Sequence, residues 1–145
     1  MTMISNLFKK RFRNCEFDGG EISGTNFAPK RVTKTETGTL TLEECMGTVI
    51  DNTGQAAVMT LTVPAAVSEI GFKFEVVTPG NAVYLKAGPS DKYEHDGVWT
   101  DDADKIGIAL PVVGDCVCIE GMRTGETTYD LRSTSGIGAW ADSGQ

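Results

Sequence analysis

The sequence has few of the residues on which catalytic and metal sites are usually built. It contains a single histidine, His95, and four cysteines without a CxxC pair. A histidine-based triad would have to use His95, which lies beside two acids in a turn-rich stretch. No apolar run approaches the ~18 residues of a membrane-spanning helix. The first residues place their charges after a short apolar patch, unlike a secretory signal. We therefore expect neither an active site nor a membrane span.

The cysteines are expected to be free thiols. Cys116 and Cys118 are two positions apart, so both face the same side of a strand, and a disulfide between them would be strained. A lone CxC without histidine support is a weak zinc pattern. The interpretation is four free, buried thiols, Cys15 and Cys45 included, in a protein made in a reducing cytoplasm. Cys116 and Cys118 would then be neighbours in a core or an interface.

Positive charge is scarce except at the N-terminus. The 145 residues carry a formal net charge of −7, yet residues 1–14 hold four basic residues and no acid. The rest of the chain therefore carries −11, the difference between −7 and +4. An acidic body argues against nucleic acid as the main partner, because phosphates would be repelled. The sequence predicts a basic N-terminal anchoring arm and linker over 1–37, followed by a β-rich globular domain over 38–145.

The N-terminal tip has apolar residues at helical spacing. Such a short amphipathic segment is unstable alone in water and would gain order only on a partner. It could bind nucleic acid, lie on an anionic membrane, dock on an acidic protein surface, or stay solvated. Docking on protein is the functional interpretation that we prefer. The expected contact residues are Ile4, Leu7, Phe8, Lys9, Lys10, Arg11, Phe12 and Arg13.

Period-two alternation dominates the body. Residues 57–63 and 72–77 alternate apolar and polar side chains, and Pro64 ends the first of these strands. Seventeen glycines favour short strands joined by tight turns. We predict an all-β fold, a single antiparallel β-sandwich or barrel-like domain of about eight short strands. The remaining strands are expected over 38–42, 48–51, 82–86, 106–113, 115–120, 127–132 and 137–141, with a helical turn at 43–46.

The acidic segment 89–104 interrupts this pattern. It predicts a protruding loop or hairpin, with Tyr93, His95 and Trp99 forming a distal contact loop. Its aspartates suggest calcium, but counting an EF-hand from Asp102 places Ile106 and Val113 at ligand positions. We interpret the aspartates as a solvated acidic loop and expect no metal and no cofactor.

Three stretches resemble small virion proteins of tailed bacteriophages, which include capsid decoration proteins, head fibres and tail-fibre domains. They are LTLEECMGTVIDNTGQAAVMTLTVPAA, GFKFEVVTPGNAVYLKAG and PVVGDCVCIEGMRTGETTYDLRSTSGIGAW. Their order of an Asn-x-Gly turn, a strand ending in Val-Pro-Ala, a Gly-Phe-x-Phe strand and a Val-Gly-Asp turn is what resembles that group. The segment GGEISGT is similar to linkers of trimeric phage fibres.

This resemblance implies a non-enzymatic virion protein made in the host cytoplasm. We expect a homotrimeric capsid decoration or head-fibre protein whose N-terminal arm docks on the major capsid protein or another virion protein. The alternative is a receptor- or glycan-binding domain of a tail fibre, in which Tyr93, His95 and Trp99 contact the host. Neither alternative involves nucleic acid or a membrane. A third hypothesis, a hydrolase of cell-wall polymers, finds no motif to support it.

Overall fold

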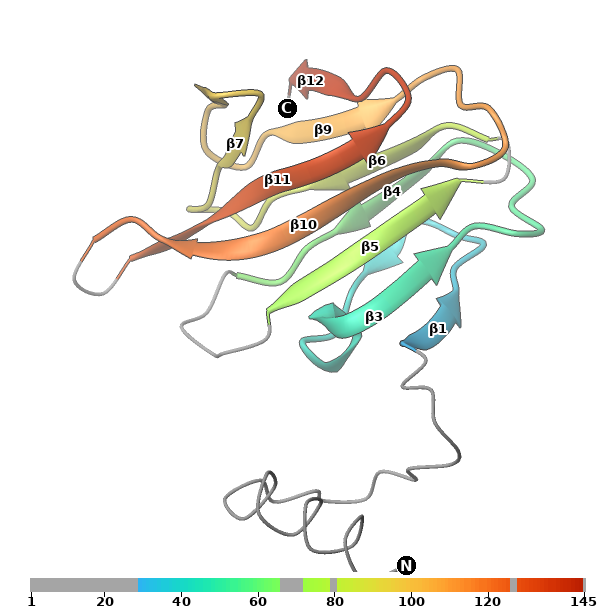
Figure 1. The fold of residues 1–145 in the computed structure, drawn as a ribbon, viewed down its shortest axis with the longest axis horizontal. Coiled ribbons are helices and arrows are strands. Elements are labelled where there is room, and N and C mark those ends of the chain that lie inside the picture. The colour runs from blue at the N-terminus through green and yellow to red at the C-terminus, as the bar shows by residue number, and fades with distance from the viewer. Residues whose placement is uncertain (1–28, 66–71, 79–80, 126–127, 145) are drawn as a thin grey trace, which may run out of the picture.

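A computed structural model describes residues 29–65, 72–78, 81–125 and 128–144, apart from the side chain of Ser135. The basic tip, from Ile4 to Arg13, and Cys15 lie outside the described residues. Within them the chain forms twelve strands and one short 3-10 helix (Figure 1). No helix in this part of the chain is long and apolar enough to cross a membrane.

The elements follow one another closely. The first half contains β1 (Lys30–Thr33), β2 (Gly38–Thr39), η1 (Glu43–Cys45), β3 (Met46–Asp51), β4 (Met59–Thr62), β5 (Lys73–Thr78) and β6 (Val83–Lys86). The second half contains β7 (Tyr93–His95), β8 (Val98–Trp99), β9 (Lys105–Ile108), β10 (Asp115–Arg123), β11 (Tyr129–Ile137) and β12 (Ala141–Gly144). The predicted all-β character and the helical turn near residue 43 are confirmed.

The strands form two sheets of mixed direction. The seven-stranded sheet has the order β1-β3-β5-β10-β11-β7-β8, and the five-stranded sheet has the order β12-β9-β6-β4-β2. The first six strands alternate between the sheets, so β1, β3 and β5 run parallel in one and β2, β4 and β6 run parallel in the other. The later strands pair mostly antiparallel, as in the long β10–β11 hairpin.

The prediction of a purely antiparallel sheet is therefore wrong. The turn residues between the early strands suggest hairpins, in which neighbours in sequence are neighbours in one sheet. In the structure these connections carry the chain from one sheet to the other. Each strand then pairs with the strand two positions earlier, in the same direction.

One hydrophobic core lies along the inner faces of the two sheets. The alternation read from the sequence places Met59, Leu61 and Val63 inside, and Phe74 and Val76 face them from β5. Phe72 meets Phe74 edge to face, with ring centroids 6.3 Å apart. The strands predicted over 57–63 and 72–77 are confirmed. In each of them one face is buried and the other face is more exposed, as the alternation of side chains requires.

Two predicted strands end differently. The strand expected over 106–113 stops at Ile108, and an exposed loop follows. Pro111 has no N–H for a ladder, and the Val112 N–H donates to Asp115 instead, at 2.7 Å. Trp140 precedes β12 rather than lying in it, and its ring is buried in the core.

The end of the predicted arm belongs to the body. Residues 30–37 are part of the predicted arm, but β1 is the edge strand of the seven-stranded sheet, in parallel register with β3 (Figure 1). Three ion pairs attach this basic segment to acids of the body. They are Lys30–Glu43, Arg31–Asp51 at 3.1 Å and Lys34–Glu44 at 2.6 Å. The sequence pattern missed this because the acids lie up to twenty positions away.

Candidate interaction surfaces

A row of alternating charges crosses the outer face of the seven-stranded sheet. The cross-strand register aligns Lys73, Glu120, Arg132, Glu94 and Trp99 on five successive strands. Lys73 pairs with Glu120 at 4.0 Å, and Arg132 donates through Nε to Glu94. Because the charges satisfy one another, this part of the face is polar but locally neutral.

The opposite end of the same face is apolar. Ile137, at the end of β11, lies across from Cys116 of β10, which in turn lies across from Val77 of β5. The β9–β10 loop meets this end of the sheet, at the right of Figure 1. Four large aliphatic side chains there are between 64% and 90% exposed: Leu110, Val112, Val113 and Ile137. We call these four residues the apolar end.

Asp115 holds the apolar end together. Its carboxylate accepts a hydrogen bond from the Val112 N–H, and its own N–H donates to the Val112 carbonyl at 2.9 Å. Gly138, which has a φ of +102°, lies directly against the same carboxylate. The loop and the end of β11 are therefore fixed to one buried side chain.

The cysteines differ from the prediction of four buried thiols. Cys45 is fully buried, and burial, with a smaller contribution from Glu44, raises the pKa of its thiol to about 12. Cys116 and Cys118 are only half-buried, because Val117 and Ile119 take the inner face of β10. Burial, followed by the hydrogen bond with Glu75, raises the pKa of Cys116. They lie on the outer face of the sheet, so the interface interpretation remains and the core interpretation is wrong.

The three residues of the predicted distal contact loop are separated. Tyr93 points inward and is completely buried, so the expectation that it is exposed is wrong. Trp99 is 44% exposed, at the edge of the sheet. The alternation along β7 explains the difference, because Tyr93 and His95 face inward while Glu94 and its cross-strand neighbour Trp99 face outward.

His95 lies in a small cavity of about 210 Å³, not in an exposed loop as the sequence suggests. Its Nε2 is 3.0 Å from the carbonyl oxygen of Trp140, which can only accept, so Nε2 carries a hydrogen. In the neutral ring Nδ1 is then an acceptor, and the Ser133 hydroxyl, 2.7 Å away, donates to it.

In this pair the serine hydroxyl donates its hydrogen to the histidine ring, which is the hydrogen-bond direction that a nucleophilic serine needs. The neighbouring carboxylate does not complete a buried triad, because Asp96 is exposed and its Oδ2 is 3.7 Å from an Nε2 that already faces Trp140. We interpret His95 as a tether that holds the β7–β8 hairpin to β11 and to the segment before β12.

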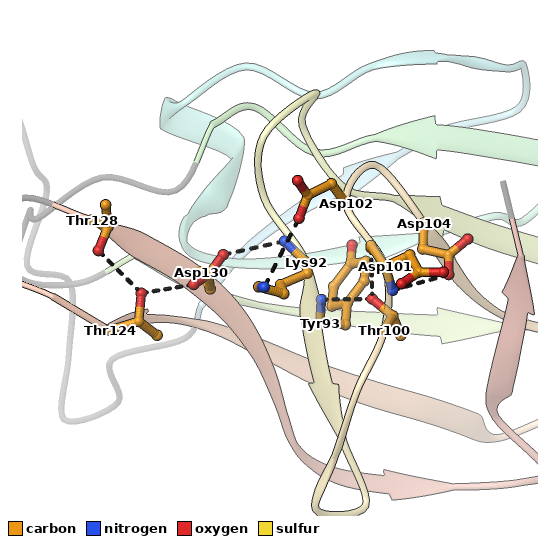
Figure 2. A network of polar contacts seen from close by, with 9 residues as sticks. All are labelled: Lys92, Tyr93, Thr100, Asp101, Asp102, Asp104, Thr124, Thr128 and Asp130. Atoms are coloured by element: carbon orange, nitrogen blue, oxygen red, sulfur yellow. Dashed lines mark hydrogen bonds and ion pairs between the residues drawn. The ribbon is translucent and has the colours of Figure 1, made fainter.

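The acidic segment 89–104 is attached to the body through the backbone of Lys92 and through the pairing of β7 with β11. Figure 2 shows Asp130 accepting from the Lys92 N–H at 3.2 Å and from the Thr124 hydroxyl at 2.7 Å. Further along, the Asp101 N–H donates to Asp104. The predicted hairpin is present, since β7 pairs antiparallel with β8. The segment does not protrude as a loop, because β7 also pairs with β11 and Tyr93 is buried. The sequence could not show this, since the anchoring partners, Asp130 and Leu131, come from β11.

These aspartates are the residues that suggest calcium in the sequence. In the part of the chain that the structure describes, no three His, Cys, Asp or Glu side chains are grouped to hold a metal. A polar groove of about 480 Å³ does lie beside them. Its lining residues are Ser90, Asp91, Lys92, Asp102, Thr128, Tyr129 and Asp130. The sequence alone does not bring this set together, because three of the seven residues come from the far end of the β10–β11 hairpin.

No protein-family model matches the chain, and no curated protein matches it significantly.

Proposed function

We propose that this protein is a structural component of a bacteriophage particle, a capsid decoration or head-fibre protein that docks through its N-terminal arm. The observation that carries the proposal is the division of charge, +4 on residues 1–14 against −11 on the rest. A basic, aromatic-bearing segment on an acidic body suits docking on an acidic protein surface. Its Phe and Arg residues are of the types that anchor interfaces.

The attachment of the arm to the body supports this proposal. The arm enters at β1, an edge strand that is paired with β3 and held by three ion pairs. Burial raises the pKa of the Glu44 carboxyl, but the hydrogen bond from Lys34 and a backbone bond from Thr41 outweigh it, and the pKa lies below its ordinary value. Glu44 is therefore charged at neutral pH. Because β1 is paired with β3 and held by ion pairs, a force applied to the arm would be transmitted to the seven-stranded sheet without separating β1 from β3.

The proposal includes assembly as a homotrimer. Three arms on one assembly multiply weak binding at repeated capsid sites through their effective concentration. The outermost strands of the two sheets are short, from two to four residues in β1, β8, β12 and β2. Short edges discourage association by strand addition. Copies would therefore meet through faces or loops rather than through sheet edges.

Deletion of residues 1–14 tests the anchoring. The truncated and full-length proteins are compared for co-sedimentation with particles that lack this protein, at two salt concentrations. We expect the truncated protein to keep its circular dichroism spectrum and to lose binding. The full-length protein should bind more weakly at high salt, because salt screens the arm's charges.

A matched variant with Lys9, Lys10, Arg11 and Arg13 changed to Gln separates charge from apolar contact. It should retain only the salt-independent part of the binding. Particle binding by the truncated protein equal to that of the full-length protein would refute the anchoring proposal.

A receptor- or glycan-binding role in a tail fibre is the second candidate. The observation that favours it is exposed Trp99, whose cross-strand neighbour Glu94 pairs with Arg132. An aromatic ring beside a carboxylate and a guanidinium suits sugar stacking and hydrogen bonding. A glycan array tests it: Trp99→Ala should abolish binding, while Val98→Ala, on the opposite face of β8, should not. An array with no binding by the wild-type protein would remove this candidate.

A further inference from the structure

We infer that the apolar end, formed by Leu110, Val112, Val113 and Ile137, is where a second copy of this chain docks. This inference rests on the assembly part of the proposed function and gives it a location on the molecule. It does not depend on the arm or on what the arm binds.

The exposure of the four aliphatic side chains supports this inference. Single exposed aliphatic residues are normal on protein surfaces, but a contiguous apolar patch marks an interaction site. Here the four side chains come from two segments far apart in sequence, the β9–β10 loop and the end of β11. The adjoining pair across the sheet, Val77 and Cys116, carries no charge. Beyond it the row becomes polar, because buried Asp51 lies across from Val77 on β3.

The backbone that carries the side chains of the apolar end is also held in place. Asp115 is buried, and it binds the Val112 backbone through both its own backbone N–H and its carboxylate. Its backbone carbonyl accepts a hydrogen bond from the Thr78 hydroxyl at 3.2 Å, which joins the patch to β5. A loop so fixed presents its aliphatic side chains with little further loss of entropy on binding.

The distribution of charge indicates that the occupant of the apolar end is another copy of this chain. The stretches 106–114 and 133–141, which meet at this end, contain no charged residue, in a chain of which 23% is charged. The carboxylate between them, that of Asp115, is buried and accepts a hydrogen bond from the loop. Copies with a net charge of −7 repel one another, and this repulsion is weakest where both surfaces are uncharged. A basic or acidic partner would gain nothing from this surface. The apolar end of another copy satisfies the condition.

The size of the contact sets its extent. A stable protein interface buries about 800 Å² on each partner, which exceeds what four side chains supply. The contact therefore extends over the row of Val77 and Cys116, whose side chains are half-buried in the single chain. Around a three-fold axis, three apolar ends would meet, as the proposed trimer requires.

Light scattering after size exclusion, and sedimentation equilibrium on the full-length chain, test the inference without particles or glycans. Val113→Asp and Ile137→Asp each place a charge in the contact. We expect an oligomer for the wild-type chain and a rise of about a hundredfold or more in the dissociation constant of each variant. Their circular dichroism should be unchanged, since both side chains are exposed in the single chain. The matched control is Val58→Asp, which is equally exposed but lies before β4 and should keep the oligomer.

Three results would overturn the inference: a wild-type chain that is monomeric at tens of micromolar, variants that associate as tightly as wild type, or Val58→Asp weakening association equally. Binding of a monomeric wild-type chain to phosphatidylcholine vesicles, lost in Val113→Asp, would assign the surface to lipid and also overturn it. If a charged variant does not fold, Leu110→Ser on the same loop is measured in its place. An unchanged dissociation constant for that variant would overturn the inference. Because the chain is measured alone, failure here is distinguishable from failure of particle binding.

Discussion

The carboxylate of Asp115 occupies the space that a side chain at Gly138 would need. A Cβ built on Gly138 would lie 2.5 Å from Cγ of Asp115. Gly138 also has a φ of +102°, where residues with a side chain are strained. The two residues close the contact between the β9–β10 loop and the end of β11. A glycine at this position is therefore required by a steric contact as well as by backbone conformation.

Gly138→Ala should lower the free energy of unfolding by about 3 kcal/mol, from the left-handed backbone and the displaced carboxylate together. Chemical denaturation measures it. The matched control is Gly97→Ala, with a φ of +81° and nothing within 4 Å of a Cβ, which should lose only about 1 kcal/mol. Equal losses in the two variants would show that the contact with Asp115 contributes nothing.

Tyr93→Phe should leave the stability unchanged or raise it by up to about 1 kcal/mol. The Tyr93 hydroxyl is buried and has no hydrogen-bond partner among the described residues, so the variant removes an unsatisfied polar group and keeps the ring. Thermal and urea unfolding measure the change. Tyr93→Ala, by contrast, should cost about 4 kcal/mol, because it empties a core position. A loss of more than about 1 kcal/mol in Tyr93→Phe would reveal a bound water at the hydroxyl.

The tether interpretation of His95 predicts that Ser133 is chemically inert. A fluorophosphonate probe should not label the native protein, because no buried carboxylate among the described residues completes the pair. His95→Ala should cost about 1–3 kcal/mol of stability, since it leaves the Ser133 hydroxyl and the Trp140 carbonyl without their partner. Asp96→Asn is the control and should change little. Labelling that disappears in Ser133→Ala would instead identify a nucleophilic serine.

Cys45 should resist alkylation in the native protein at any pH below about 11. Its thiol is fully buried and has a pKa of about 12, so almost no thiolate forms. Iodoacetamide at pH 8, followed by peptide mass spectrometry, should modify half-buried Cys118 faster than Cys45. In urea both should react at similar rates. Modification of Cys45 at the rate of Cys118 in the folded protein would show that this part of the core opens readily.

Much of the core could be read from the chain. Met59, Leu61 and Val63 are buried as their alternation predicts, and Phe74 and Val76 follow the same rule. Tyr93 shows the limit of that reading. It lies in an acidic, turn-rich stretch that suggests a loop, yet it begins a short strand, β7, that pairs with β11. Which face of a three-residue strand is buried depends on its neighbour.

One of the two proposed interaction surfaces can be predicted from the sequence, and the other cannot. The basic tip is visible in the sequence because charge is a property of composition. The apolar end is not visible, since Val112 and Ile137 are twenty-five positions apart and read as two separate strands. Only the buried Asp115 carboxylate between them creates one surface.

The sequence by itself determined that the chain is built of strands, where most of them lie, and that an acidic body follows a basic tip. These features depend on residues within a few positions of one another, through alternation, turn chemistry and charge. Only the tertiary structure decided that the early strands alternate between two sheets in parallel, that β1 belongs to the body, and that Asp130 of β11 holds the acidic segment at Lys92. Each of these depends on partners distant in sequence, whose pairing is selected by the packing of the whole core.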